Sequence, residues 1–199
     1  MAISNNSTGL RPGVCLSSSR PTAPYEGQMI FETDTDMVAI WNGSSWRYIS
    51  ATTPTNGTVL QVVTATHSTA VTNSTTTYAD TGLTATITPK SSSSKILVLI
   101  NHSSSEKSAG DAGNGLNIQL HRQIGAGSFS NAYQAVKDCG FTNSAVRMFF
   151  SASNSFLDTP SSTSALTYKT MFANRVTGSY VEVQTSSSNS FITLMEIAG

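Results

Sequence analysis

The chain has 199 residues, and its 11 Lys and Arg balance 11 Asp and Glu, so the formal charge is zero and only 11% of positions are charged. This balance argues against a protein that binds nucleic acid. Ser and Thr are abundant, with 32 and 27 positions, while the hydrophobic content is 38%. We therefore expect a surface rich in hydroxyl groups, and a core that gains from burial against a partner.

No segment indicates export or membrane insertion. Residues 1–13 lack the basic and apolar regions of a signal peptide, and no run approaches the ~18 apolar residues of a spanning helix. Cys15 and Cys139 lie far apart and form no metal-binding spacing, so we expect two reduced thiols.

The first part of the chain divides by composition. Residues 1–27 mix three Pro and three Gly with polar residues, which predicts an extended anchoring arm. Residues 28–49 alternate short apolar runs with turns, and Asn42-Gly43 is a strong hairpin signal, so they predict a three-stranded β-meander. Residues 50–58 are polar, contain Pro54, and predict a linker.

Residues 59–199 contain eight or nine short β-rich runs separated by turns, and none has helical periodicity. Leu116, Ile118 and Leu120 alternate with polar residues, as expected for a sheet with one wet face. The fold class is therefore predicted to be all-β, with the small N-terminal meander followed by a jelly-roll β-sandwich.

Two strands are apolar on both faces. Ile96, Val98 and Ile100 oppose Leu97 and Leu99, and the segment from Phe191 shows the same pattern. A two-layer sandwich buries only one face of each strand, so a neighbouring subunit is expected to cover the other. The predicted subunit interface consists of Ile96, Leu97, Leu99, Phe149, Ile192 and Leu194.

Two blocks of sequence resemble known proteins. SSSRPTAPYEGQMIFETDTDMVAIWNGSSWRYI, residues 17–49, resembles a short N-terminal module of bacteriophage tail-fibre and virion proteins. YADTGLTATITPKSSSSKILVLINHSSS, with the closing FITLMEIAG, resembles the C-terminal half of tailed-phage proteins. At fold level this domain is similar to the trimeric jelly rolls of the tumour necrosis factor and complement-head type. The resemblance implies a homotrimer located in the virion, and it supplies no catalytic residue.

Catalytic and metal-binding patterns are weak throughout. His67, His102 and His121 have no Cys or carboxylate at metal-ligand spacing, although His102 on a three-fold axis remains an alternative ion site. Asp34 and Asp36 suit a turn rather than a calcium loop. No G-x-S-x-G elbow or carboxylate pair appears. We expect no enzyme activity, no metal and no cofactor.

These observations predict a short homotrimeric tail fibre or receptor-binding protein that contacts other virion proteins and a host-surface glycan or protein. The virion-anchoring residues are predicted to be Arg11, Pro12, Arg20, Pro21, Pro24, Tyr25, Trp41 and Trp46. The host-contact residues, placed in loops, are predicted to be Asn101, Glu106, Asp111, Asn114, Ser128, Asn131 and Asn154.

Two other functions use the same parts. A capsid decoration, cement or head-fibre protein would also have an anchor and a β-domain, and it would stabilise the shell instead of binding a host. A cellular carbohydrate-binding module fits the β-sandwich and the aromatics Trp41, Trp46 and Tyr48, but it leaves the arm unexplained. Packing of these aromatics against one another or against a partner is the simpler interpretation.

Overall fold

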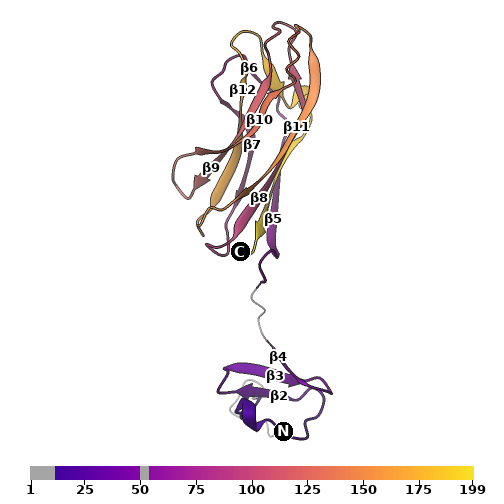
Figure 1. The fold of residues 1–199 in the computed structure, drawn as a ribbon, viewed down its shortest axis with the longest axis vertical. Helices are drawn as coiled ribbons and strands as arrows, with labels where there is room; N and C mark the ends of the chain where they lie inside the picture. Colours follow the sequence, from indigo (N-terminus) through magenta and orange to yellow (C-terminus); the bar gives the residue numbers. More distant parts are fainter. Residues whose placement is uncertain (1–11, 50–53) are drawn as a thin grey trace. The chain divides into compact units, whose positions relative to one another are not determined.

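The computed structural model describes residues 12–49 and 54–199, and the chain divides into two compact units after Thr53 (Figure 1). The elements of the first unit are β1 (Gly13–Cys15), the 3-10 turn η1 (Ser17–Ser19), β2 (Met29–Glu32), β3 (Met37–Trp41) and β4 (Trp46–Tyr48). They form one sheet in the order β1-β2-β3-β4. Arg11 and the first part of the expected linker lie outside the described residues.

Part of the predicted extended arm pairs with the sheet of this unit. β1 runs parallel to β2, with Val14 opposite Phe31. The backbone N–H of Ser17 also donates to the Asp34 carboxylate in the β2–β3 turn (2.8 Å). Composition did not indicate this pairing, because pairing at a sheet edge needs only backbone groups.

A buried carboxylate holds this unit together. Glu32 is fully buried, and its oxygens accept hydrogen bonds from Arg20 Nε (2.5 Å) and the Tyr48 hydroxyl (2.9 Å). The Arg20 guanidinium also lies over the Tyr48 ring. These contacts hold the pKa of Glu32 below its ordinary value, with the Arg20 hydrogen bond as the largest cause. Breaking one partner would leave a buried charge uncompensated.

The second unit is formed by ten strands and one 3-10 turn within residues 54–199. They are β5 (Val59–His67), β6 (Val71–Asn73), β7 (Ala79–Ile87), β8 (Lys95–Lys107), β9 (Leu116–Ile124), β10 (Ser130–Cys139), β11 (Met148–Asp158), β12 (Leu166–Asn174), β13 (Val181–Val183), η2 (Thr185–Ser187) and β14 (Ser190–Ile197).

Their pairing confirms the predicted jelly roll. One sheet has the order β10-β9-β12-β7, and the other runs β5-β14-β8, with β11 on the free side of β8. β13 pairs with the C-terminal end of β8, and β6 pairs with β13, so both strands extend this second sheet. Neighbours in sequence, such as β7 and β8 or β11 and β12, lie in opposite sheets, as a jelly roll requires (Figure 1).

The core lies between the two sheets and follows the two-residue period of their strands. Alternate residues of β7, β8, β9, β12 and β14 are buried, whereas their neighbours point outward. The largest fully buried apolar side chains here are Leu83, Ile87, Ile96, Leu116, Ile118, Leu120, Leu166, Tyr168, Phe172 and Ile192.

Two segments that we expected to be loops are strands. β8 continues through the Ser-rich stretch to Lys107, and β11 covers Ser151 to Asp158. β11 pairs with β8 along this whole length, and β13 pairs with its last residues. The polar composition concealed these strands, because backbone pairing on both sides stabilises β8 where apolar side chains are few.

His102 lies inside the sandwich, so the alternative of an exposed ion site on a symmetry axis is wrong. Its Nδ1 accepts a hydrogen bond from Gln184 Nε2 (3.1 Å), so Nε2 carries the proton and donates to Thr170 Oγ1 (3.2 Å). The Thr170 hydroxyl in turn contacts that of Thr81 (2.6 Å). Burial lowers the pKa of His102 to about 4.

The buried imidazole predicts a loss of stability in acid. The unfolded chain binds a proton at His102 near pH 6.5 and the folded chain only near pH 4, so between these values protonation favours unfolding. We expect the free energy of unfolding to fall across this window by up to about 3 kcal/mol more in the wild type than in His102→Gln. Denaturant titrations at several pH values measure this difference. Parallel pH profiles for the two proteins would contradict the assignment.

Candidate functional site: the outer faces of the jelly roll

The outer face of the sheet β5-β14-β8-β11 carries no ionisable side chain over its central three rows. Register places the members of each row side by side across four strands. We call this surface the uncharged face, and its rows are Thr66, Phe191, Asn101 and Ser153; Thr64, Thr193, Leu99 and Ser155; and Val62, Met195, Leu97 and Leu157.

The third row is apolar from edge to edge. Val62 is 53% exposed and Leu157 is 50% exposed, while Leu97 between them is half-buried. In the other rows, polar side chains bond to one another: Thr64 Oγ1 contacts Thr193 Oγ1 (3.1 Å), and Asn101 Nδ2 donates to Ser153 Oγ (2.8 Å). Asn101 Oδ1 in the first row is buried and has no hydrogen-bond partner among the described residues. An uncharged surface that combines an apolar row with hydroxyl and amide groups has the composition of an interface core.

The structure divides the residues of the predicted subunit interface between the surface and the core. Leu97 and Leu99 lie on the uncharged face, whereas Ile96, Ile192 and Leu194 are fully buried in the chain's own core. The prediction is wrong for these three residues. Because both faces of β8 and β14 are apolar, the sequence did not distinguish inward from outward positions. Phe149, near the N-terminal end of β11, is 57% exposed, and the Arg147 guanidinium lies over its ring.

Two predicted host-contact residues are inaccessible, and both predictions are wrong. Glu106 is fully buried and accepts hydrogen bonds from Arg147 Nε (3.0 Å) and Nη2 (2.7 Å) and from the Tyr180 hydroxyl (3.0 Å). Asn114 is also fully buried, and its amide oxygen accepts a hydrogen bond from Asn174 Nδ2 (2.9 Å). Both polar side chains therefore form hydrogen bonds within the jelly-roll unit and are not available to a partner.

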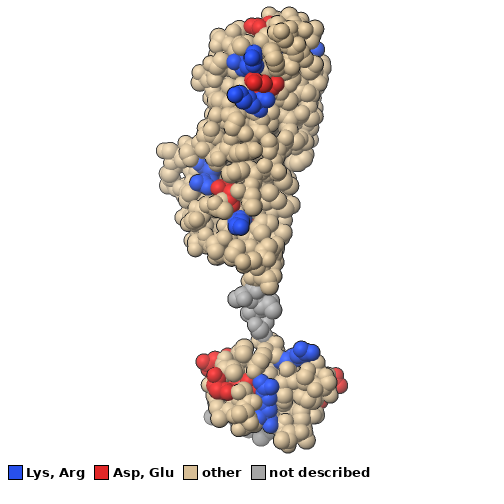
Figure 2. Space-filling model, viewed as in Figure 1, with Lys and Arg blue, Asp and Glu red and all other residues tan. Residues whose placement is uncertain are grey.

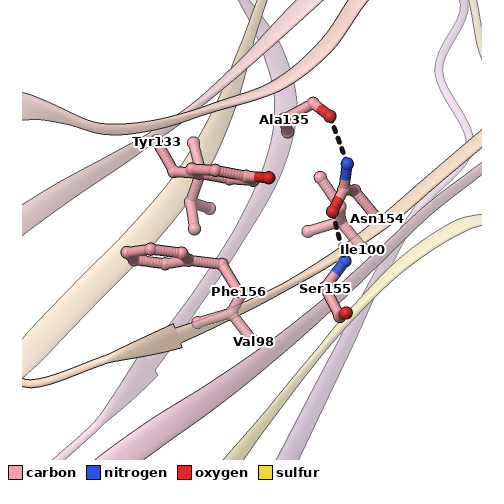
Figure 3. A pocket seen from close by; sticks show the side chains of 8 residues that line it. Val98, Ile100, Tyr133, Ala135, Asn154, Ser155 and Phe156 are labelled. Atoms are coloured by element: carbon pink, nitrogen blue, oxygen red, sulfur yellow. Dashed lines mark hydrogen bonds between the residues drawn. The ribbon is translucent and has the colours of Figure 1, made fainter.

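The other predicted host-contact residues divide between strands and turns. Asn101 belongs to β8, and half-buried Asp111 accepts a hydrogen bond from the Gly113 N–H (2.6 Å). Asn154 bridges the two sheets: its Nδ2 donates to the Ala135 carbonyl of β10, and its Oδ1 accepts from the Ser155 N–H (2.7 Å) (Figure 3). Ser128 and Asn131 alone of this set are fully solvent-facing.

A small hollow lies beside Asn154, between β10 and β11. The Tyr133 and Phe156 rings stack across it, with centroids 4.7 Å apart and an angle of 9° between their planes (Figure 3). Val98, Ile100 and Leu120 also line it, and it has no room for a water molecule. Small-molecule sites usually measure ~300–1,000 Å³, so this hollow is a packing gap and not a ligand site.

Some of the predicted anchoring residues make contacts within the N-terminal unit, and others are exposed. Arg20 is engaged with Glu32, and Pro12, Pro21 and Pro24 lie in the segment that packs beside the sheet. Trp41 and Trp46 pack edge to face with centroids 5.6 Å apart, which confirms the expectation of mutual packing. Tyr25 is 63% exposed. Sequence reasoning missed the other exposed apolar side chains of this unit, which are Val14, Leu16, Met29 and Ile49.

Several charged side chains of the jelly-roll unit form ion pairs, among them Arg122 with Asp158 and Lys169 with Asp80. Figure 2 shows blue and red atoms of the jelly-roll unit next to one another, with wide uncharged areas between them. Within residues 12–49 and 54–199, no three His, Cys, Asp or Glu side chains gather as a metal site would need. In the same residues, no helix has the length and hydropathy to cross a membrane.

Comparison with known proteins gives matches only among solved structures. No family model and no curated protein matches the chain. Two structures from infectious bursal disease virus, the Gx strain and a VP2 subviral particle, align with TM-scores of 0.41 and 0.44 at 11% and 10% identity. Each alignment covers 91% of this chain but only 42% and 41% of the viral chains. TM-scores of this size do not establish a shared fold, so the jelly-roll assignment rests on strand order.

The uncharged face predicts a specific response to charge. Leu97→Asp places a carboxylate in the apolar row, and we expect it to convert an oligomer to monomers or aggregates, because an unpaired charge in an interface core is costly. Sedimentation velocity measures the change. Thr86→Asp on the other sheet is the matched control, since Thr86 is exposed there, and it should leave the assembly intact. A soluble Leu97→Asp oligomer of normal stability would refute this interface.

Proposed function

We propose that this protein is a structural protein of a tailed-bacteriophage virion, acting as a short homotrimeric tail fibre or receptor-binding protein. In this role the N-terminal unit attaches to other virion proteins and the jelly roll contacts the host surface. The function needs no enzyme chemistry and no cofactor. The observation that carries the proposal is the uncharged face, because a side of the domain suited to burial indicates a chain that works as part of an assembly.

The resemblance of residues 17–49 to tail-fibre modules supports the phage origin, and the fold-level similarity to trimeric jelly rolls supports three copies. A heterologous contact in which each copy uses two different surfaces closes into such a ring. Three copies on one particle would also let weak host contacts act together through avidity.

The composition of the N-terminal unit supports an anchoring role. Among its described residues, the buried hydrophobic side chains are Ile30 and Ala39, whereas Val14 is 69% exposed and Tyr25 is 63% exposed. So small an apolar core does not stabilise an independent domain of this size. A protein surface that covers Val14, Leu16 and Tyr25 would supply the missing burial.

Removing the N-terminal unit tests the anchor. A chain that lacks residues 1–53 keeps every strand of the jelly roll, so it should fold and assemble as the full chain does. We expect it to be absent from purified particles, as judged by sedimentation and immunoblotting, because it lacks the attachment surface. Its continued incorporation into virions would refute the anchoring role.

Position on the particle separates a fibre from a decoration protein. Electron microscopy of whole particles with the C-terminus gold-labelled should place the label on tail appendages. Label spread over the head lattice would replace the fibre proposal with shell stabilisation. Label absent from particles altogether would reject a virion role.

A further inference from the structure

The outer face of the second sheet, β10-β9-β12-β7, has a different chemistry from the uncharged face. We call it the amide face. Register groups its outward side chains into rows, which are Gln123, Thr167 and Thr86; Asn131, His121, Lys169 and Thr84; Gln134, Gln119, Met171 and Asp80; and Asn117 and Ala173 beside Tyr78. Amides and hydroxyls dominate these rows. Each side-chain amide offers hydrogen-bond donors and an acceptor, and each hydroxyl offers both functions.

The polar groups of this face are already held in position. The Tyr78 hydroxyl donates to Gln134 Oε1 (3.1 Å), which also accepts from Gln119 Nε2 (3.1 Å). Gln119 Oε1 accepts from His121 Nε2 (3.0 Å), so Nδ1 is the acceptor nitrogen of the neutral imidazole. Gln134 Nε2 is fixed by the Ile118 and Val136 carbonyls. A surface ordered in advance loses little side-chain entropy when a ligand binds.

The Tyr78 side chain reaches across this face. Tyr78 precedes β7 at one edge of the sheet, yet its hydroxyl bonds Gln134 on β10 at the opposite edge, so the side chain extends over β12 and β9. Ala173 points outward from β12 but is only 1% exposed, which is consistent with cover by this side chain. An aromatic ring on the outside of a sheet offers a face on which apolar C–H groups of a sugar stack.

The charges of the amide face cancel. Lys169 Nζ pairs with Asp80 Oδ2 (2.8 Å) and lies over the Phe129 ring, 4.4 Å from its centroid. Partial burial and the nearby Lys169 lower the pKa of His121, which favours its neutral form. Within these rows an ionic ligand would find no unpaired opposite charge, whereas a neutral ligand with many hydroxyls would match both the donors and the acceptors. Lys137, which is exposed further along β10, lies beyond the rows.

We propose that the amide face binds a neutral carbohydrate chain, with Tyr78 as stacking platform and Gln119 and His121 as hydrogen-bonding groups. This inference rests on the proposed host-contact function and moves its site from the loops to a sheet. A second copy of the chain does not fit this face, because burial would desolvate a dozen polar groups without apolar gain. The uncharged face offers a copy the better surface.

Side-chain and backbone NMR of the isotope-labelled full chain tests the site directly. The probes are neutral oligosaccharides built from glucose, galactose, mannose, rhamnose or N-acetylglucosamine, with an acidic polyuronate for comparison. We expect a neutral sugar to shift the Gln119 and Gln134 amide and the His121 imidazole signals. Gln119→Ala should weaken that binding by about tenfold, because it removes a fixed hydrogen-bonding group. Ser128→Ala, on an exposed turn, is the matched control and should bind as the wild type does.

The outcomes separate this inference from the virion proposal. Absence of shifts with every neutral sugar, shifts with the polyuronate alone, or shifts confined to the Ser128 turn would each overturn the amide-face site. Sedimentation with particles is measured on the same proteins. Particle association without sugar binding would leave the virion role intact, whereas sugar binding without particle association would reject only the virion role.

Discussion

A two-layer sandwich has one interior, while each of its strands has two faces, and this constraint governs the whole second unit. In β8 the interior takes Ile96, Val98 and Ile100, so Leu97 and Leu99 are left on the outside. The same division occurs in β14. The two outer faces of the sandwich differ in their side chains. One is uncharged and includes an apolar row, and the other carries amides, hydroxyls and an ion pair. The domain therefore presents one surface suited to protein contact and another suited to hydration or polar ligands.

The C-terminal half of β8 shows how a Ser-rich segment can form a strand without apolar side chains. His102, Glu106 and Lys107 are buried there, and each is hydrogen-bonded to groups from other elements. Lys107 Nζ donates to Thr142 Oγ1 (2.9 Å) and to the Ser144 carbonyl (2.8 Å), which fixes the turn between β10 and β11. Buried polar groups with defined partners allow one arrangement where apolar groups would allow several.

The sequence predicted the fold class well, because two-residue alternation and turn residues are local signals. The same local signals identified β8 and β14 as strands with two apolar faces. The sequence did not resolve which face of β8 is internal, since Ile96 and Leu97 are equally apolar, and that choice depends on strands distant in sequence. The loop expectations failed at Glu106 and Asn114, because their polar character indicated exposure while long-range partners bury them. Composition also gave no sign that β1 pairs with β2, because this contact is made through the backbone.

The amide face could not be found from sequence either. Gln119 and His121 showed the alternation of a wet sheet, but Tyr78 and Gln134 join them only through pairing between β7, β12, β9 and β10. The proposed carbohydrate site thus depends on rows of side chains that run across the strands, whereas sequence patterns run along single strands. The turns that connect strands remain the parts where composition alone is most informative.

The pairing of β5 with β14 also determines how the domain would carry mechanical load. The chain enters at the end where Gly57 donates to the Ala198 carbonyl (2.8 Å), and β5 then runs antiparallel to β14 as far as His67 opposite Ser190. A pull on the chain at Pro54, with the domain held by its sheets, acts along β5 and loads all of these backbone hydrogen bonds together in shear. Strands loaded in this way resist extraction far better than strands peeled apart one bond at a time.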